Sequence, residues 1–442
     1  MYIKVYDLNS GLPLEKGTYT EIANPSFAPS ADLAGVSIPI NSFQIDIHTD
    51  DTIEIGWQAE LYDDLDNLWA QYWIVYAERT DEYMLHLEAE SEIGILDKIT
   101  LPATYYSGEN IANVLDDIIV WSTLGSVVPM SYSLDGSFAL ETITGFCPNQ
   151  TARERLLWVT FTIGAYVKTC FNQGIEILPI DDTQTTIPVS DIYWKPMVSY
   201  SEWVTAIRGH AYSFTIGTPS TTDTYVEDDI GNTYIVTETT ITIQNQNVPA
   251  AAPENIVEIE GVYLLNEDNL SGVLTRLTDW YFNRTELDFD AINNRSYIPG
   301  DKVLVQIDDE NLVSGYISSA TFAFGVQAKA TMHLTGVENV DAAKLTALCK
   351  YNGKQIGKKM YTFPVGYAYS VDMPYIDLTM NGHRYIFRPT TATVTGTMAS
   401  GGTTVTVDYA VALDLHEGVL KIISVDGITT TTESGETVGV IE

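Results

Sequence analysis

Cysteine is scarce in this 442-residue chain, and the few cysteines form no pattern. Cys147, Cys170 and Cys349 are odd in number, lie far apart and contain no CxxC pair. Disulfide frameworks and thiolate zinc sites need paired or clustered cysteines. We therefore expect three reduced thiols inside the cores of a protein made in the cytosol.

Basic residues are also few. The chain has 22 Lys and Arg against 59 Asp and Glu, a formal net charge of −37. Such a surface cannot neutralise phosphates, which argues against nucleic-acid binding by a basic patch. The charge has two interpretations: it keeps the protein soluble, or it lines a conduit through which another polyanion slides without sticking.

Long apolar runs are absent. No stretch approaches the roughly 18 uninterrupted apolar residues typical of a membrane span. The opening MYIKVYDLNSGLPLEKG has no basic segment followed by an apolar one, so it predicts no export signal.

Motifs for nucleotide and metal chemistry are missing as well. Neither a Walker loop nor GxGxxG occurs. His416-Glu417 begins like a zincin helix, but Leu420 stands where the second histidine belongs. A partial calcium loop lacks its glycine and terminal glutamate, which favours a solvated acidic turn; its acidic residues are Asp63, Asp64 and Asp66.

The histidines are scattered singly, and an isolated strand histidine is usually structural. They are His48, His86, His210, His333, His383 and His416. Cys349 and His383 could form a hydrolase dyad, but no sequence context places them together. The sequence thus predicts no catalytic, cofactor-binding or metal-binding residue, and no cofactor.

What the chain does have is material for several folded cores. Its length allows about three domains of roughly 150 residues. Apolar residues make up 45% of it, and 27 Tyr and 8 Trp argue against disorder. Aromatic residues at this level suit barrel cores and subunit interfaces.

The most informative stretch runs over residues 145–180. Thr151 and Glu154 have the spacing of a capping box, which starts a helix that Gly164 ends. Alternating residues 165–171 and 175–178 then predict a hairpin whose turn includes Gly174. We expect this stretch to set the path of the backbone, and it presents no nucleophile.

Short alternating runs predict a first small β-barrel or sandwich over residues 1–95. A mixed α/β domain follows over residues 96–187. In it, Ser107 is expected to cap a helix and Asp135-Gly136 to turn a hairpin. The apolar face of that helix would consist of Ile111, Val114, Leu115, Ile118 and Ile119.

A second β-barrel is expected from residues 188–252 and 291–340, with a strand–helix segment over 253–290 inserted into it. The strands in this region are predicted over 200–214, 234–244 and 256–264, and a Pro-Ala-rich junction over 249–253. The predicted helix carries one apolar face, made of Leu270, Val273, Leu274, Leu277, Trp280 and Tyr281. Pro299, Gly300 and Asp301 form a turn before the last strands. The fold class is therefore α+β and β-dominated, with two small β-barrels separated by mixed α/β domains.

Residues 341–442 form a C-terminal extension, a basic linker or helix followed by a β-rich module. Asn381-Gly382 between alternating runs predicts a tight hairpin. The basic residues, which would pair with acidic protein surface, are Lys344, Lys350, Lys354, Lys358 and Lys359.

The order of these parts over residues 1–340 resembles the baseplate hub, or tail-hub, family of long-tailed bacteriophages and related contractile injection particles. The segments that carry the resemblance are Tyr105–Ser107, Thr151–Leu157, Gly164–Val167, Gly174–Ile177, Asn269–Arg284, Pro299–Asp301 and Gly315–Ile317.

The resemblance implies a homotrimeric ring of six similar barrels that adapts a hexameric tail tube to a three-fold spike or tip. Its partners would be the tail tube, the spike or tail-tip and the tape-measure protein, in a virion tail assembled in the host cytoplasm. The acidic charge would line a channel for DNA or the tape measure. The alternatives are a tail-associated cell-wall hydrolase and a receptor- or carbohydrate-binding tail protein.

Overall fold

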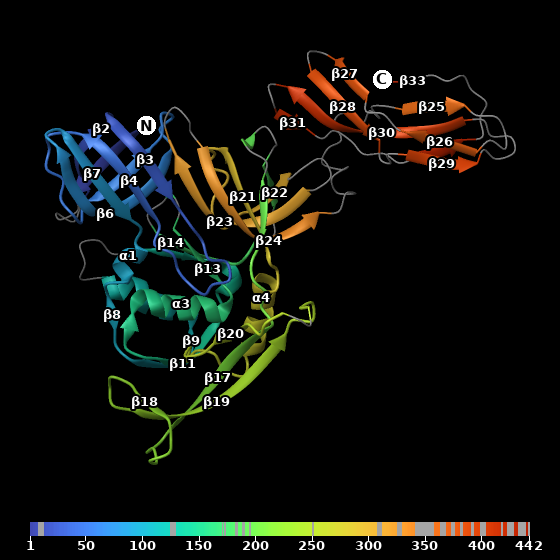
Figure 1. Ribbon diagram of the computed structural model, residues 1–442. Coiled ribbons are helices and arrows are strands. Elements are labelled where there is room, and N and C mark those ends of the chain that lie inside the picture. The colour runs from blue at the N-terminus through green and yellow to red at the C-terminus, as the bar shows by residue number, and fades with distance from the viewer. Residues whose placement is uncertain are drawn as a thin grey trace. The chain divides into compact units, whose positions relative to one another are not determined.

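The computed structural model describes residues 1–7, 13–123, 130–169, 171, 174–181, 184–187, 191–193, 196–249, 252–306, 312–324, 329–340 and the strands between Lys358 and Val440. The chain forms two compact units. The first comprises Met1–Thr185, Pro196–Val303 and Gly315–Val337; the second comprises Thr186–Lys195, Leu304–Ser314 and Glu338–Glu442. The expectation of a β-dominated α+β fold is confirmed (Figure 1).

A 13-stranded sheet contains strands from both ends of the first 340 residues. Its order is β16-β21-β24-β23-β3-β4-β7-β6-β5-β1-β2, with β22 on β23 and β15 on β22. The early strands are β1 (Tyr2–Asp7), β2 (Leu14–Tyr19), β3 (Ile22–Ala28), β4 (Ser42–His48), β5 (Gln58–Tyr62), β6 (Leu68–Asp81) and β7 (Met84–Glu90). The late strands are β15 (Gln184–Thr186), β16 (Met197–Tyr200), β21 (Thr285–Ile292), β22 (Lys302–Gln306), β23 (Leu312–Ala323) and β24 (Lys329–Val340).

The sheet contains the same strand arrangement twice. The early half reads β3-β4-β7-β6-β5-β1 across the sheet, and the late half reads β16-β21-β24-β23-β22-β15. When β2, which pairs with β1 at the outer end, is set aside, numbering the strands by chain order within each half gives the same order of neighbours in both. The sheet is therefore an internal repeat, and the residues between β16 and β21 are an insertion into its second copy.

One polar pair recurs at the same place in both halves. On β4 and β7, Asp46 lies opposite His86, whose Nδ1 is 2.6 Å from the carboxylate. On the equivalent strands β21 and β24, Asp288 lies opposite His333 at 2.7 Å. The residues flanking each pair are buried, as the period of two requires. The repeat thus extends from topology to individual side chains.

The halves join where β3 pairs with β23. Phe27 lies opposite Phe322, and both side chains are fully buried with ring centroids 5.9 Å apart. Trp69 packs its edge on Phe322 at 5.1 Å and on Phe171 at 5.9 Å. Burying each such ring contributes on the order of 1.5–3 kcal/mol. An aromatic cluster therefore holds the early and late strands in one sheet.

The central α/β region follows β7. Its elements are α1 (Ile93–Leu96), β8 (Thr100–Leu101), β9 (Thr104–Asn110), α2 (Ile111–Leu115), a π-helix (Asp116–Trp121), β10 (Tyr132–Leu134), a 3₁₀ helix (Gly136–Phe138), β11 (Thr142–Cys147), β12 (Gln150–Thr151), α3 (Ala152–Ile163), β13 (Tyr166–Lys168) and β14 (Ile175–Leu178).

The predicted capping box is confirmed. Thr151 accepts from the backbone N–H of Glu154, and the Glu154 carboxylate accepts from that of Thr151. Gly164 ends α3 in the left-handed region at φ 81°, and β13 pairs antiparallel with β14. The helix and hairpin predicted over 145–180 are therefore both present.

Two local predictions in this region were wrong. Asn110 caps α2 by accepting from the Ala112 N–H at 2.9 Å, whereas Ser107 lies in β9. The expected helix face is nevertheless buried. Asp135-Gly136 turns no hairpin, because Asp135 caps the 3₁₀ helix through Ser137. β10 instead pairs in parallel with β14, a long-range choice that no local pattern reveals.

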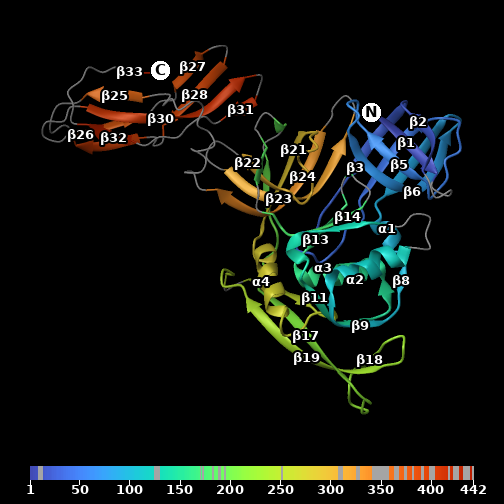
Figure 2. The same cartoon turned by 180° about the vertical axis from the view of Figure 1, so that it is seen from behind.

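The insertion between β16 and β21 forms its own sheet in the order β18-β19-β17-β20. It contains β17 (Ala206–Ile216), β18 (Tyr225–Glu227), β19 (Thr233–Gln244), β20 (Ile256–Ile259) and α4 (Leu270–Tyr281). Both views show α4 against this sheet (Figures 1 and 2). Gly209 permits the approach, because a Cβ there would lie 2.6 Å from the Leu270 side chain.

The predicted helix face of α4 is confirmed, since Leu270, Val273, Leu274 and Leu277 are buried. The strand predicted over 200–214 is in fact divided between β16 and β17, and the strand predicted over 256–264 ends at Ile259. In the junction predicted over 249–253, residues 250 and 251 lie outside the described residues, and the Ala252 N–H donates to the Pro249 carbonyl at 2.9 Å.

The second unit contains the C-terminal strands: β25 (Lys358–Thr362), β26 (Ala368–Asp372), β27 (Ile376–Met380), β28 (His383–Pro389), β29 (Thr393–Thr397), β30 (Thr404–His416), β31 (Val419–Lys421), β32 (Ile428–Thr431) and β33 (Gly439–Val440). Met380 lies opposite His383, as expected for strands flanking the predicted Asn-Gly turn. Lys358 and Lys359 begin β25; the other lysines of the basic segment lie outside the described residues.

Glu92 is an ionisable group buried between the large sheet and the central region. It is 1% exposed; Oε1 accepts from the Gly174 N–H at 3.2 Å, and Oε2 has no hydrogen-bond partner. Burial raises the pKa of Glu92 to about 7 from an ordinary value of 4.5. The folded state therefore holds a proton that the unfolded chain releases near pH 4.5.

We predict that stability contributed by this proton is complete below pH 4.5 and is lost as pH rises through 7. The loss is about 3 kcal/mol in the free energy of unfolding. Glu92→Gln keeps an acceptor for Gly174 without a charge, so it should remove this pH dependence in urea denaturation at pH 5 and pH 8. Glu141→Gln, at an exposed site, should leave it unchanged. Parallel profiles for wild type and Glu92→Gln would contradict the assignment.

Candidate assembly interface

Several reactive groups of the described residues serve structural roles. Cys147 is buried, and burial raises the pKa of its thiol to about 12. Asp63 accepts from the backbone N–H groups of Leu65 and Asn67 and from the Trp69 indole, a turn rather than an ion site. Among the described residues no group of three His, Cys, Asp or Glu could hold a metal ion. Cys170 and Cys349 lie outside these residues.

The described histidine side chains pair with carboxylates. Besides the two cross-strand pairs of the repeat, His48 lies 3.3 Å from Glu21. Hydrogen bonding to Asp46 raises the pKa of His86. The pairs of His86 with Asp46 and of His333 with Asp288 bridge neighbouring strands, which is a structural role.

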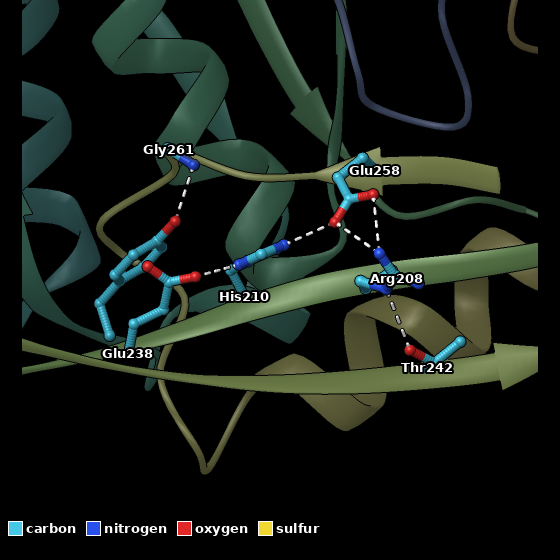
Figure 3. A network of polar contacts seen from close by, with 7 residues as sticks. Arg208, His210, Glu238, Thr242, Glu258 and Gly261 are labelled. Carbon is cyan, nitrogen blue, oxygen red and sulfur yellow. Dashed lines mark hydrogen bonds and ion pairs between the residues drawn. The ribbon is translucent and has the colours of Figure 1, made fainter.

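Figure 3 shows the densest polar network, on the inserted sheet. His210 on β17 contacts Glu238 on β19 and, at 2.8 Å, Glu258 on β20. Arg208 lies 3.4 Å from both Glu258 Oε2 and Thr242 Oγ1. The bond to Glu258 raises the pKa of His210. The network ties three strands together across the face opposite α4.

Two sets of sequence landmarks meet in space. Gly174 allows the β13–β14 hairpin, which places Lys168 3.5 Å from Asp301, more than a hundred residues away. Gly300, at φ 102°, lets the turn approach Tyr166, and a Cβ there would lie 2.7 Å from the Tyr166 hydroxyl. Gly300 and Asp301 also exchange backbone hydrogen bonds with Ile317 on β23. The landmark turn therefore locks the central region to the late half of the sheet.

A pocket of about 440 Å³ opens at this contact. Its charged lining combines Lys168 and Lys302 with Asp135, Asp181 and Asp301. Burial raises the pKa of Asp301, against the opposing effect of Lys168. The mixture of both signs beside a structural turn is typical of a packed joint rather than of a catalytic centre.

The outer strand β16 presents an unpaired edge. Within the described residues it pairs with β21 alone. Ser201 donates its N–H to Arg284, directly after the pair Tyr200–Thr285. Because antiparallel pairs alternate, the N–H and C=O of Val198 and Tyr200 point away from β21. Their side chains are 37% and 67% exposed. An exposed apolar edge of this kind pairs readily with another strand.

A second unpaired edge lies on β6. β5 covers β6 from Leu68 to Trp73, and the neighbouring loop covers Ile74. Residues 75–81 pair on one side only, with β7. The strand equivalent to β6 in the late half is β23. The part of β23 that corresponds to this stretch pairs with β3. Within the described residues the repeat thus leaves two strand edges unpaired, that of β16 and that of residues 75–81 on β6.

Sequence reasoning marked the joint residues as fold landmarks but predicted neither their contact nor the two edges. Thr151, Glu154, Gly164, Gly174, Pro299, Gly300 and Asp301 were identified as landmarks of the fold, and the structure brings the last two against the hairpin that Gly174 permits. The edges depend on which strands pair, and a single alternating run such as 197–200 carries no information about its neighbours.

We predict that Gly300→Ala destabilises the joint by about 1–3 kcal/mol, because it adds a methyl group at positive φ against Tyr166. Thermal and urea denaturation measure the change. Gly272→Ala is the matched control: this α4 glycine has open space around its Cβ position, and alanine there should stabilise by up to about 1 kcal/mol. Equal stability of Gly300→Ala and wild type would contradict the role given to Gly300.

No protein-family model matches the sequence, and no curated protein matches it significantly. Solved structures do share the architecture. A tail protein from Neisseria meningitidis MC58 aligns with 76% of this chain and 97% of its own at 12% identity and a TM-score of 0.51.

The 43 kDa tail protein of prophage MuSo2 from Shewanella oneidensis covers 76% of this chain and 98% of its own at 8% identity and a TM-score of 0.49. The prophage tail protein gp18 from Listeria monocytogenes EGD-e covers 78% and 98% at 11% identity and the same TM-score of 0.49. At these identities the likeness concerns fold, and the Neisseria protein carries it: this chain has the fold of a solved tail protein.

Proposed function

We propose that the chain is the structural hub of a phage tail or tail-like particle and acts as a homotrimeric ring. The ring adapts a hexameric tail tube to a three-fold spike or tail-tip complex. Its role is non-enzymatic, and its partners are the tube, the spike or tip and the tape-measure protein.

The observation that carries the proposal is the internal repeat. Each chain contributes two halves of identical strand order. Three copies in a ring would present six equivalent halves to a six-fold partner and three inserted sheets to a three-fold partner. A single kind of chain can therefore match both a six-fold and a three-fold partner. The shared fold of the Neisseria tail protein supports the same assignment.

The unpaired edges supply the contact between copies. Inside one chain, β3 of the early half pairs with β23 of the late half. By the repeat, β16 of the late half takes the place of β3, and β6 takes the place of β23. The exposed edge of β16 would thus pair with residues 75–81 of β6 in a second copy. Repeating this contact closes the ring without leaving either edge unpaired.

The net charge of −37 fits a channel through which DNA or the tape-measure protein passes. Carboxylates lining the ring would repel phosphates, but only over the ~8–10 Å that physiological salt allows. The relevant charges are therefore those on the inner wall. An assembled ring with a neutral or basic inner wall would exclude this part of the proposal.

We predict that the purified chain has a mass in solution of three times its 48.9 kDa at micromolar concentration. Tyr200→Pro removes an outward N–H from the β16 edge and spares the bonds to β21, so it should give folded monomers. Light scattering after size exclusion measures the mass, and circular dichroism reports folding.

Tyr200→Thr is the control, because it removes the aromatic ring and keeps the backbone N–H. It should remain trimeric. A wild-type protein that stays monomeric at every concentration, also with tube or spike protein present, would overturn the hub; a trimeric Tyr200→Pro would overturn the β16 contact alone.

A further inference from the structure

A groove of about 520 Å³ lies beside the end of β16 and is not used by the strand pairing described above. It runs between the segment 31–36, the C-terminal end of α4 and the late strands β21, β23 and β24. Its apolar wall is formed by Ala31, Leu33, Ala34, Val36 and Val204. The volume falls within the range of roughly 300–1,000 Å³ in which proteins hold ligands.

The charges in the groove have one sign. Asp32, Glu202 and Glu286 line it, and no lysine, arginine or histidine does. Arg284 is the basic residue closest in sequence to Glu286. It stacks on Trp203 at 4.0 Å and donates to the Ser201 carbonyl. Within the described part of the chain none of the three carboxylates forms an ion pair, and only Asp32 accepts a side-chain hydrogen bond, from Ser37. The negative charge is uncompensated.

A second polar group in the wall also lacks a partner. The indole N–H of Trp280 is buried and has no acceptor. Its ring is fixed against Tyr316 at 5.2 Å and against Gly336, so it cannot turn toward another acceptor cheaply. A buried donor without an acceptor costs about 1–3 kcal/mol. Because this nitrogen has no accessible surface, the cost belongs to the packing of the ring, and a ligand in the groove would not relieve it.

These features select the kind of ligand. Among the described residues no three acidic groups lie close enough together to hold a metal ion. Carboxylates spread along an apolar wall suit a longer cation, whose aliphatic stem packs on the wall while its charged end reaches a carboxylate. Lysine and arginine side chains have this form.

We propose that this groove binds an extended segment of a partner protein through a lysine or arginine side chain. A carboxylate among Asp32, Glu202 and Glu286 receives the charged end, and the apolar wall receives the aliphatic stem. The proposal adds a partner chemistry to the chain and does not depend on ring formation, because every group that it uses lies in one copy.

The test uses the full chain and three fluorescent seven-residue peptides that are identical except at the centre, which is lysine, norleucine or glutamate. Fluorescence polarisation at 50 mM salt should show the lysine peptide binding at least tenfold more tightly than the norleucine peptide, and the glutamate peptide least. At 500 mM salt the advantage of lysine should fall severalfold, because exposed charges are screened.

Glu202→Gln with Glu286→Gln should abolish the preference for lysine. Because the whole surface is acidic, the matched control neutralises two exposed carboxylates elsewhere, Glu109→Gln with Glu141→Gln, and should keep it. Equal binding of lysine and norleucine peptides, or equal loss in both double variants, would overturn the groove. Either result leaves the measured oligomer mass, and so the hub, untouched.

Discussion

The pairing of β3 with β23, packed by Phe27 against Phe322, is the contact on which the first unit depends. It joins strands almost three hundred residues apart in sequence. Closing so long a loop costs chain entropy, and the contacts between the aromatic rings offset that cost only once the loop is closed. Trp69 and Phe171 add edge-on contacts around the same point. Without this cluster the two halves of the repeat would be separate sheets, each with an exposed edge.

The join also bears on the proposed assembly. The two halves of the repeat are joined by β3 and β23. Within the described residues, the equivalent strands β16 and β6 keep the corresponding edges unpaired. Exposed edges of this kind promote association, and proteins usually block them with charge or bulges. Here Val198 and Tyr200 leave the β16 edge apolar and accessible. The same physics that completes the sheet inside one chain therefore favours association between chains.

Polar groups in this structure serve architecture in a consistent way. Asp46 with His86, Asp288 with His333, and Lys168 with Asp301 each bridge elements that are distant in sequence. Within the described residues none belongs to a group of three His, Cys, Asp or Glu that could hold a metal ion. The groove next to β16 differs, because within the described residues its carboxylates form no ion pair. It is therefore the place where we propose that charge serves a partner.

Local chemistry was readable from the sequence where a few adjacent residues decide the outcome. The capping box of Thr151 and Glu154, the end of α3 at Gly164, the β13–β14 hairpin and the apolar face of α4 all follow from hydrogen bonding and periodicity within about a dozen residues. Tertiary structure alone decided that Asp135 caps a 3₁₀ helix and that β10 pairs with β14. It also decided that β17 to β20 form a sheet apart from the large one and that β3 pairs with β23. Strand pairing is a choice among many similar edges, and its free energy lies in contacts that only the folded chain brings together.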